Sequence, residues 1–170
     1  MSSVTTDLAL RSLSERGSYE SQTTQKQPAI ELVFLRLKEI EMSNDQERLT
    51  VPAGIFGYHF GTRIEPDVYA MASRLSPDYR GGYWDFYKTE QGAFFMAPAD
   101  KGPFLVCSNN GYEGFMSAEA FGLTACLYVY SHATFTQVGK LLDSCANQFH
   151  LLRDHAKGHP EAMAIFEAID

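Results

Sequence analysis

The sequence is short of positive charge. It has 14 Lys and Arg residues against 21 Asp and Glu residues, which gives a net charge of −7. This balance disfavours non-specific binding to nucleic acid or to an anionic membrane surface. The acidic residues are nevertheless too diluted by basic ones to imitate duplex DNA, which carries one charge per about 1.7 Å. We therefore expect no direct nucleic acid partner, no membrane partner and no extended DNA mimic.

Cysteine and long apolar runs are also scarce. The three cysteines, Cys107, Cys126 and Cys145, show no paired spacing, and each lies in an apolar run typical of a buried, inert thiol. No stretch approaches the roughly 18 apolar residues that a membrane span needs. The N-terminus has no continuous apolar region like that of a signal peptide. These absences predict a soluble cytoplasmic protein without a disulfide framework.

Catalytic and cofactor-binding motifs are missing as well. The chain has no GxSxG elbow, P-loop, GxGxxG or CxxC motif. His155 and His159 have the spacing of two helical metal ligands, but Gly158 and Pro160 predict a helix break between them, and a third ligand is missing. We expect no cofactor, no metal site and no catalytic residue. The alternative is a small enzyme whose site is assembled from His132, His150, Glu113 or Asp154.

What the chain does contain is the material for one core. Hydrophobic residues make up 45% of the 170 positions and aromatic residues 13%, in a length typical of one domain. Residues 1–27 are rich in Ser, Thr, Gln and charge, which predicts a flexible N-terminal arm. The remaining residues, 28–170, are expected to form a single domain.

Apolar residues at helical spacing, bounded by capping residues, predict six helices. The first is an amphipathic helix over 28–42, and the second is a short helix capped by Asn44 or Asp45 and broken by the Pro and Gly residues of 51–61. The third follows Glu65-Pro66 and ends at Ser76-Pro77, and the fourth is a buried helix over 118–135 capped by Ser117. The fifth runs from Thr134 or Thr136 to about Lys157-Gly158 with Val138 on its buried stripe, and the last is opened by His159-Pro160.

Between these helices the apolar period changes to two. The segment GGYWDFYKTEQGAFFMAP, residues 81–98, predicts a hairpin that reverses at Gly92. Two further strands are expected over 104–109 and 112–116, after turns at 101–103 and 109–111. The sequence therefore predicts an α+β fold, with a small antiparallel β-meander of three to four strands packed with several α-helices.

The two faces of this hairpin suggest different roles. Trp84, Phe86, Phe94 and Met96 would form one apolar face in the core, since aromatic residues dominate cores. Two interpretations of the other face stay open. There Tyr83, Tyr87 and Phe95 flank Asp85, and either a second helix layer covers them or they contact a protein partner.

The C-terminal helix breaks a local rule. Glu167, Asp170 and the terminal carboxylate lie at the negative end of its dipole, where cations are favoured. Either the last turn frays into water, or Asp170 and Asp154 form an acidic patch that attracts a basic partner. If that patch is not the site, the next candidates are Tyr112 and Glu113, which glycines hold at a loop tip.

Three segments in order resemble a known family. LSPDYRGGYWDFYKTEQGAFFMAP, NNGYEGFMSAEAFGL and LLRDHAKGHPEAMAIFEAID look like the ArdB/KlcA antirestriction proteins of plasmids and other mobile elements, and the resemblance extends from about Ile55 to the last residue. It implies a small antiparallel sheet with helices, and a non-catalytic inhibitor of type I restriction endonucleases that differs from the strongly acidic DNA mimics. The partner would be the type I restriction-modification complex or a host factor on which it depends. The candidate partner-binding residues are Tyr83, Asp85, Tyr112, Glu113, Asp154 and Asp170.

Overall fold

The computed structural model describes residues 39–170. The predicted arm over 1–27, and most of the helix predicted over 28–42, lie outside the described residues. The end of that helix prediction is wrong, because Glu39–Glu41 form a strand, β1. Ile40 stands opposite Lys88 in an antiparallel pair, so pairing with a distant segment overrides the helical spacing of this stretch.

The predicted hairpin is confirmed, and it joins β1 in a sheet of order β1-β2-β3. Its strands are β2 (Trp84–Thr89) and β3 (Phe94–Pro98). Phe86 stands opposite Met96 and Lys88 opposite Phe94, and cross-strand partners share a face. The predicted apolar face of Trp84, Phe86, Phe94 and Met96 is therefore present, and all four side chains are buried.

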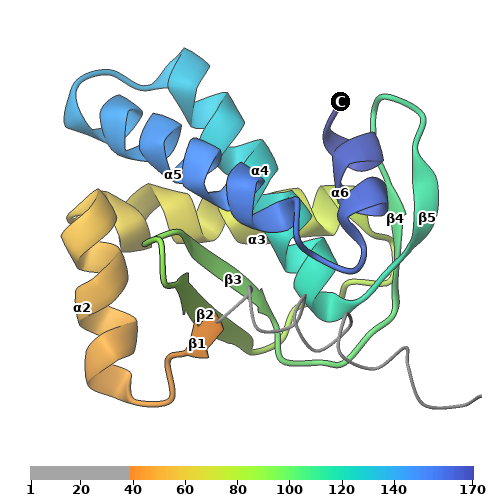
Figure 1. The fold of residues 1–170 in the computed structure, drawn as a ribbon, viewed down its shortest axis with the longest axis horizontal. Coiled ribbons are helices and arrows are strands. Elements are labelled where there is room, and N and C mark those ends of the chain that lie inside the picture. Colours follow the sequence, from red (N-terminus) through yellow and green to blue (C-terminus); the bar gives the residue numbers. More distant parts are fainter. Residues whose placement is uncertain (1–38) are drawn as a thin grey trace, which may run out of the picture.

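The two later strands form a sheet of their own. They are β4 (Phe104–Cys107) and β5 (Glu113–Met116), paired antiparallel with Val106 opposite Gly114. The α+β fold is confirmed, but the expected continuous meander is divided into two sheets. In Figure 1 the β4–β5 hairpin stands at the end of the molecule opposite α2 (Asp45–Phe56) and beside α6 (Ala162–Ile169).

Side chains from two helices explain why β4 does not extend the first sheet. These helices are α4 (Ala118–Thr136) and α5 (Lys140–Ala156). The Tyr130 hydroxyl donates to the Phe94 carbonyl over 3.0 Å. Gln148 Oε1 accepts from the Phe94 N–H over 2.7 Å, and its Nε2 donates to the Gly92 carbonyl over 3.1 Å. The outer edge of β3 is thus already hydrogen-bonded at Phe94, which prevents strand pairing at that residue.

The remaining helical elements are η1 (Phe60–Ile64), a π-helix, and α3 (Glu65–Leu75). The helix predicted after Glu65 is confirmed, as are two predicted caps. The Asn44 side chain accepts from the Glu47 N–H over 2.7 Å, and the Ser117 hydroxyl from the Ala120 N–H over 3.2 Å. Among the described residues, no helix is long and apolar enough to cross a membrane.

Three predicted helix boundaries are wrong. α2 continues through Pro52 to Phe56, and both residues are buried, so packing outweighs the lost backbone hydrogen bond. α4 runs on to Thr136, and α5 begins only at Lys140, which leaves Val138 86% exposed in the connection instead of on a buried stripe. α6 begins at Ala162, after a turn in which the Ala162 N–H donates to the His159 carbonyl.

Candidate functional site

The loop between β4 and β5 is fixed to the C-terminal end of α6. Asn110 Nδ2 donates to the Glu167 carbonyl over 2.8 Å and to the Ala168 carbonyl over 3.3 Å. The Tyr128 hydroxyl donates to the same Ala168 carbonyl over 2.6 Å. The last carbonyls of a helix lack partners inside the helix, so these donors satisfy them. The contact brings the loop residues to the same end of the molecule as Asp170.

Tyr112 is folded back across this loop. Its N–H donates to Asn110 Oδ1 over 3.0 Å. A Cβ added at Gly114 would lie 2.9 Å from Tyr112 Cζ, so only glycine lets the ring lie there. Burial raises the pKa of Tyr112, and the negative charges of Glu167 and Glu161 raise it further. Glu161 and Glu167, at the two ends of α6, thus place negative charge near the Tyr112 ring.

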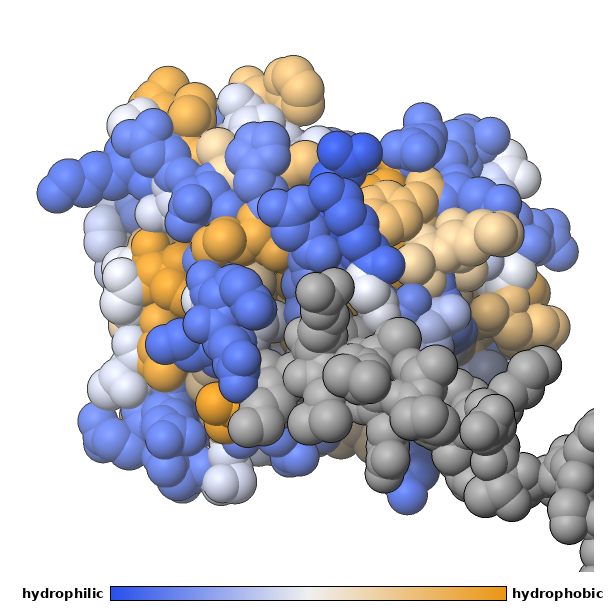
Figure 2. Space-filling view, in the orientation of Figure 1, coloured by the Kyte–Doolittle hydropathy of each residue, from blue (hydrophilic) through white to orange (hydrophobic). Residues whose placement is uncertain are grey.

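We call Tyr112, Glu113, Phe115, Glu167 and Asp170 the α6–hairpin surface, in which Tyr112 lies on the side of α6, whereas Glu113 and Phe115 alternate with it along the strand and lie on the outer face of the hairpin. Glu113, Glu167 and Asp170 are exposed, and Phe115 on β5 is 66% exposed. Figure 2 shows hydrophobic and hydrophilic side chains intermixed on the face that it presents. Exposed aromatic residues are enriched at protein interfaces, and exposed carboxylates complement the charge of a basic partner.

The last turn of α6 is closed in the structure. The Asp170 N–H donates to the Phe166 carbonyl over 3.1 Å, and no basic residue stands in that turn. Asn110 and Tyr128 supply the hydrogen-bond donors that a lysine or arginine would otherwise provide at the negative helix end. The conflict noted in the sequence is thus relieved by neutral donors, and the carboxylates stay available to solvent.

A polar network that the sequence did not reveal fixes the other end of α6. Glu161 Oε1 accepts a hydrogen bond from the Ser117 N–H over 3.0 Å, and Oε2 accepts one from the Ser117 hydroxyl. His159 Nδ1 accepts from the Glu161 N–H over 3.0 Å, while its Nε2 lies 3.2 Å from Glu119 Oε1. His159 therefore joins the starts of α4 and α6. No group of three or more His, Cys, Asp and Glu residues within 39–170 is placed to hold a metal ion.

The hairpin candidates lie on the other sheet. Tyr83 is 64% exposed, and the Arg48 guanidinium lies 4.7 Å from its ring centroid. Arg48 also donates to the Trp84 carbonyl over 2.6 Å, which fixes the guanidinium beside Tyr83. Asp85, opposite Ala97, is half-buried. This part of the hairpin is accessible from solvent.

Elsewhere the second face of the hairpin is covered. Phe95 is fully buried, stacked on Tyr87 at 4.9 Å between ring centroids and packed against His155 of α5 at 5.9 Å. A helix thus covers the face at Phe95, whereas the face stays open toward Tyr83. Cover by a helix is confirmed at Phe95, and contact of Tyr83 with a partner stays a prediction.

Asp154 is separate from the α6–hairpin surface in its contacts. It is fully exposed on α5 and lies 2.6 Å from Lys157 Nζ. A hydrogen bond from Lys157 and its charge lower the pKa of Asp154. The structure therefore brings Tyr112, Glu113 and Asp170 to one end of the molecule, while the carboxylate of Asp154 is engaged by a lysine of its own helix.

The residues considered for an enzyme are distributed over different elements. His150 and Asp154 stand one turn apart on α5 and both are exposed, Glu113 is on β5, and His132 lines a pocket between α3 and α4. Burial raises the pKa of the Cys126 thiol to about 12 and that of Cys145 to about 11, which disfavours the nucleophilic thiolate. Cys107 is only half-buried, so the prediction of a buried thiol is wrong for this residue.

Comparisons with known proteins agree with this architecture. The antirestriction protein family model matches residues 77–170. The uncharacterized protein YfjX of Escherichia coli K12 is 37% identical over 157 residues, covering 87% of this chain and 99% of YfjX. The antirestriction protein KlcA of Escherichia coli is 36% identical over 129 residues, covering 74% of this chain and 90% of KlcA.

A solved structure is similar in fold as well as in sequence. It is 34% identical, with a TM-score of 0.70, and the match covers 88% of this chain and all of the solved one. It is described as showing that KlcA and ArdB have a novel fold and antirestriction activity against type I DNA restriction systems in vivo but not in vitro. Because the family model covers more than half of the chain and two relatives exceed 30% identity over most of their length, the chain belongs to the antirestriction protein family.

Proposed function

We propose that this protein inhibits type I restriction endonucleases in the cell by protein–protein contact, and so protects incoming unmodified DNA. The observation that carries the proposal is the shared fold with KlcA and ArdB, for which antirestriction activity is described in vivo but not in vitro. An activity that needs the cell favours a mechanism that depends on a further component. That component is either the restriction complex in its cellular state or a host factor on which it relies.

Two features of the chain support protein contact over the alternatives. The net charge of −7 comes from mixed acidic and basic residues, which suits neither DNA binding nor a continuous imitation of DNA. The α6–hairpin surface combines exposed carboxylates with an exposed Phe115, and complementary charge of this kind steers protein encounters. An enzymatic mechanism has less support, since His132, His150, Glu113 and Asp154 do not converge on one site.

Plating of unmodified phage on cells with and without a type I system tests the activity. Expression of this protein should raise the titre in restricting cells and leave it unchanged in cells that lack the system. Phage that already carries the modification serves as the control for general effects on growth. Unchanged restriction across several type I systems would contradict the proposal.

Crosslinking in restricting cells, followed by purification of this protein, tests how it acts. Recovery of restriction subunits supports direct contact, and recovery of a different host protein supports the indirect route. Recovery of neither at expression levels that protect phage would refute contact as the mechanism. A variant with Glu113→Gln and Asp170→Asn should recover less partner than one with the exposed turn residue Asp100 changed to Asn.

A further inference from the structure

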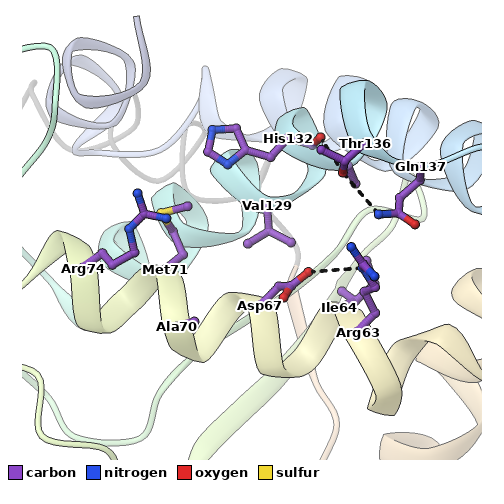
Figure 3. A pocket seen from close by; sticks show the side chains of 11 residues that line it. Arg63, Ile64, Asp67, Ala70, Met71, Arg74, Val129, His132, Thr136 and Gln137 are labelled. Carbon is purple, nitrogen blue, oxygen red and sulfur yellow. Dashed lines mark hydrogen bonds and ion pairs between the residues drawn. The ribbon is translucent and has the colours of Figure 1, made fainter.

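A pocket of about 200 Å³ opens between α3 and the C-terminal half of α4, as Figure 3 shows. It shares no residue with the α6–hairpin surface. Its floor is apolar and belongs to the core of the fold. The buried side chains that form this floor are Ile64, Met71, Val129 and Ala133.

The arginines at the two ends of the pocket differ in their partners. At one end Arg63 lies 3.8 Å from Asp67. With the Gln137 amide turned so that its oxygen faces Arg63, that oxygen also accepts from Nε and Nη2 over 3.2 and 3.0 Å. At the other end Arg74 extends from α3 and His132 from α4, both exposed (Figure 3). Among the described residues, Arg74 has no carboxylate partner, although the chain has more acidic than basic residues.

The size of the pocket restricts its ligand. Sites for drug-sized ligands and cofactors measure about 300–1,000 Å³, so this pocket suits one or two amino acid side chains. Its neighbours fit a protein contact, since Phe135 is 85% exposed one turn beyond His132, and Val138 is 86% exposed in the following connection. Exposed aromatic residues and arginine are enriched where proteins bind one another.

We propose that this α3–α4 pocket binds a peptide segment of a partner protein in which an acidic residue stands next to an aliphatic one. A Glu or Asp carboxylate of the segment pairs with Arg74 and His132, and a neighbouring aliphatic side chain packs on Val129 and Met71. The net charge of the chain opposes an acidic segment at long range, but physiological salt screens that repulsion beyond about 8 Å, whereas the Arg74 guanidinium acts in direct contact. The pocket is thus a second docking point, opposite in charge preference to the α6–hairpin surface.

This binding is testable without any antirestriction assay, and only its link to inhibition rests on the proposed function. The probe is the dipeptide acetyl-Leu-Glu-amide, and acetyl-Leu-Gln-amide is its uncharged twin. Each is titrated into the ¹⁵N-labelled full chain while backbone amide shifts are followed by NMR. We expect saturable shifts for the Leu-Glu probe around residues 63–74 and 129–137, with a dissociation constant of about 1–10 mM, the strength of a small fragment.

Two arginine variants separate the pocket from a general charge effect. Arg74→Gln should weaken binding of the Leu-Glu probe about tenfold, as expected for loss of one charge-assisted pair. Arg80→Gln, an exposed arginine outside the pocket, should leave the binding unchanged. Thermal unfolding of both variants shows whether they remain folded.

Four results would overturn the proposal. The first is that the Leu-Glu probe causes no saturable shifts in these residues, and the second is that the Leu-Gln probe binds equally well. The third is that sodium phosphate binds at the same residues more tightly than the Leu-Glu probe. The fourth is that the shifts of the same amides depend on protein concentration and accompany dimer formation. The third result would indicate a phosphate site, and the fourth would show that a second copy of the chain occupies the pocket. Failure of phage protection with the peptide binding intact would refute the proposed function and leave the pocket assignment standing.

Discussion

Gly122 lies where α4 closely approaches β3, and its replacement tests the packing of this helix on the sheet. A Cβ at this position would collide with the Met96 carbonyl oxygen and lie 2.6 Å from both Cα and Cβ of Ala97. Ordinary contact begins at about 3.4 Å, so the helix would have to move away from β3 by roughly 1 Å to clear the Met96 carbonyl oxygen. The obstructing atoms are mainly backbone, which cannot rotate aside.

From this geometry we expect Gly122→Ala to destabilise the protein by about 2 kcal/mol. Overpacking of a core costs about 1–3 kcal/mol, and the backbone obstruction places this site at the upper end. Alanine returns up to about 1 kcal/mol through its higher helix propensity. For a chain of this length the melting temperature should fall by roughly 4–8 °C, as measured by circular dichroism.

Gly54→Ala is the matched control, because Gly54 is also helical but has no atom within 4 Å of an added Cβ. It should leave the melting temperature unchanged or raise it slightly. A Gly122→Ala protein that melts at or above the temperature of the parent would refute the close approach of α4 and β3.

Four further predictions concern the core, the thiols, DNA and the acidic residues. Trp84 is 2% exposed and donates to the Tyr79 hydroxyl over 2.8 Å, so its fluorescence should resist quenching by iodide, and ready quenching would contradict its burial. Trp84→Ala should lower the free energy of unfolding in urea by about 3–5 kcal/mol. Burial raises the pKa of Cys126 to about 12 and that of Cys145 to about 11, from the usual 9.0, so above about pH 9 the unfolded chain loses the thiol protons before the folded chain does. The stability that the two buried thiols contribute is complete below that pH and should decline as the pH rises through 11–12. Unfolding curves that do not change over this range would contradict this prediction. Short duplex DNA should not bind at physiological salt, and salt-sensitive micromolar binding would make DNA a direct partner. Glu113→Gln combined with Asp170→Asn should weaken phage protection with little change in melting temperature, since both residues are exposed; full protection at equal expression would exclude this pair of residues.

The sequence predicts those parts of the fold that local chemistry decides. The caps at Asn44 and Ser117 and the reversal at Gly92 each depend on residues within one turn of the chain. β1 could not be predicted, because a strand beginning at Glu39 exists through its pairing with Thr89, fifty residues away. The same holds for the division into two sheets, which follows from side chains of α4 and α5 on the edge of β3.

For the candidate site, the sequence supplies the residues but not their proximity. The glycines around Tyr112 indicate an exposed loop tip, and the charges of the last helix are plain in the sequence. The hydrogen bond from Asn110 to the Ala168 carbonyl joins this loop to the last helix, but it spans 58 residues and has no local signal in the sequence. The placement of Arg74 and His132 at one pocket has no local signal either, since it depends on how α3 packs against α4.

The contacts at both ends of α6 bear on how the α6–hairpin surface would bind. Glu161 joins the start of α6 to Ser117, and Asn110 joins its end to the hairpin. A segment of eight residues would not hold a helix by itself, so the packing of its buried Ile165 and Ala168, together with these contacts, fixes the backbone that carries Glu167 and Asp170. A partner therefore meets carboxylates on an ordered scaffold and avoids the entropic cost of ordering a free terminus. Loss of the Asn110 side chain should for this reason weaken partner binding without removing any charge, which distinguishes a preorganised surface from a merely acidic one.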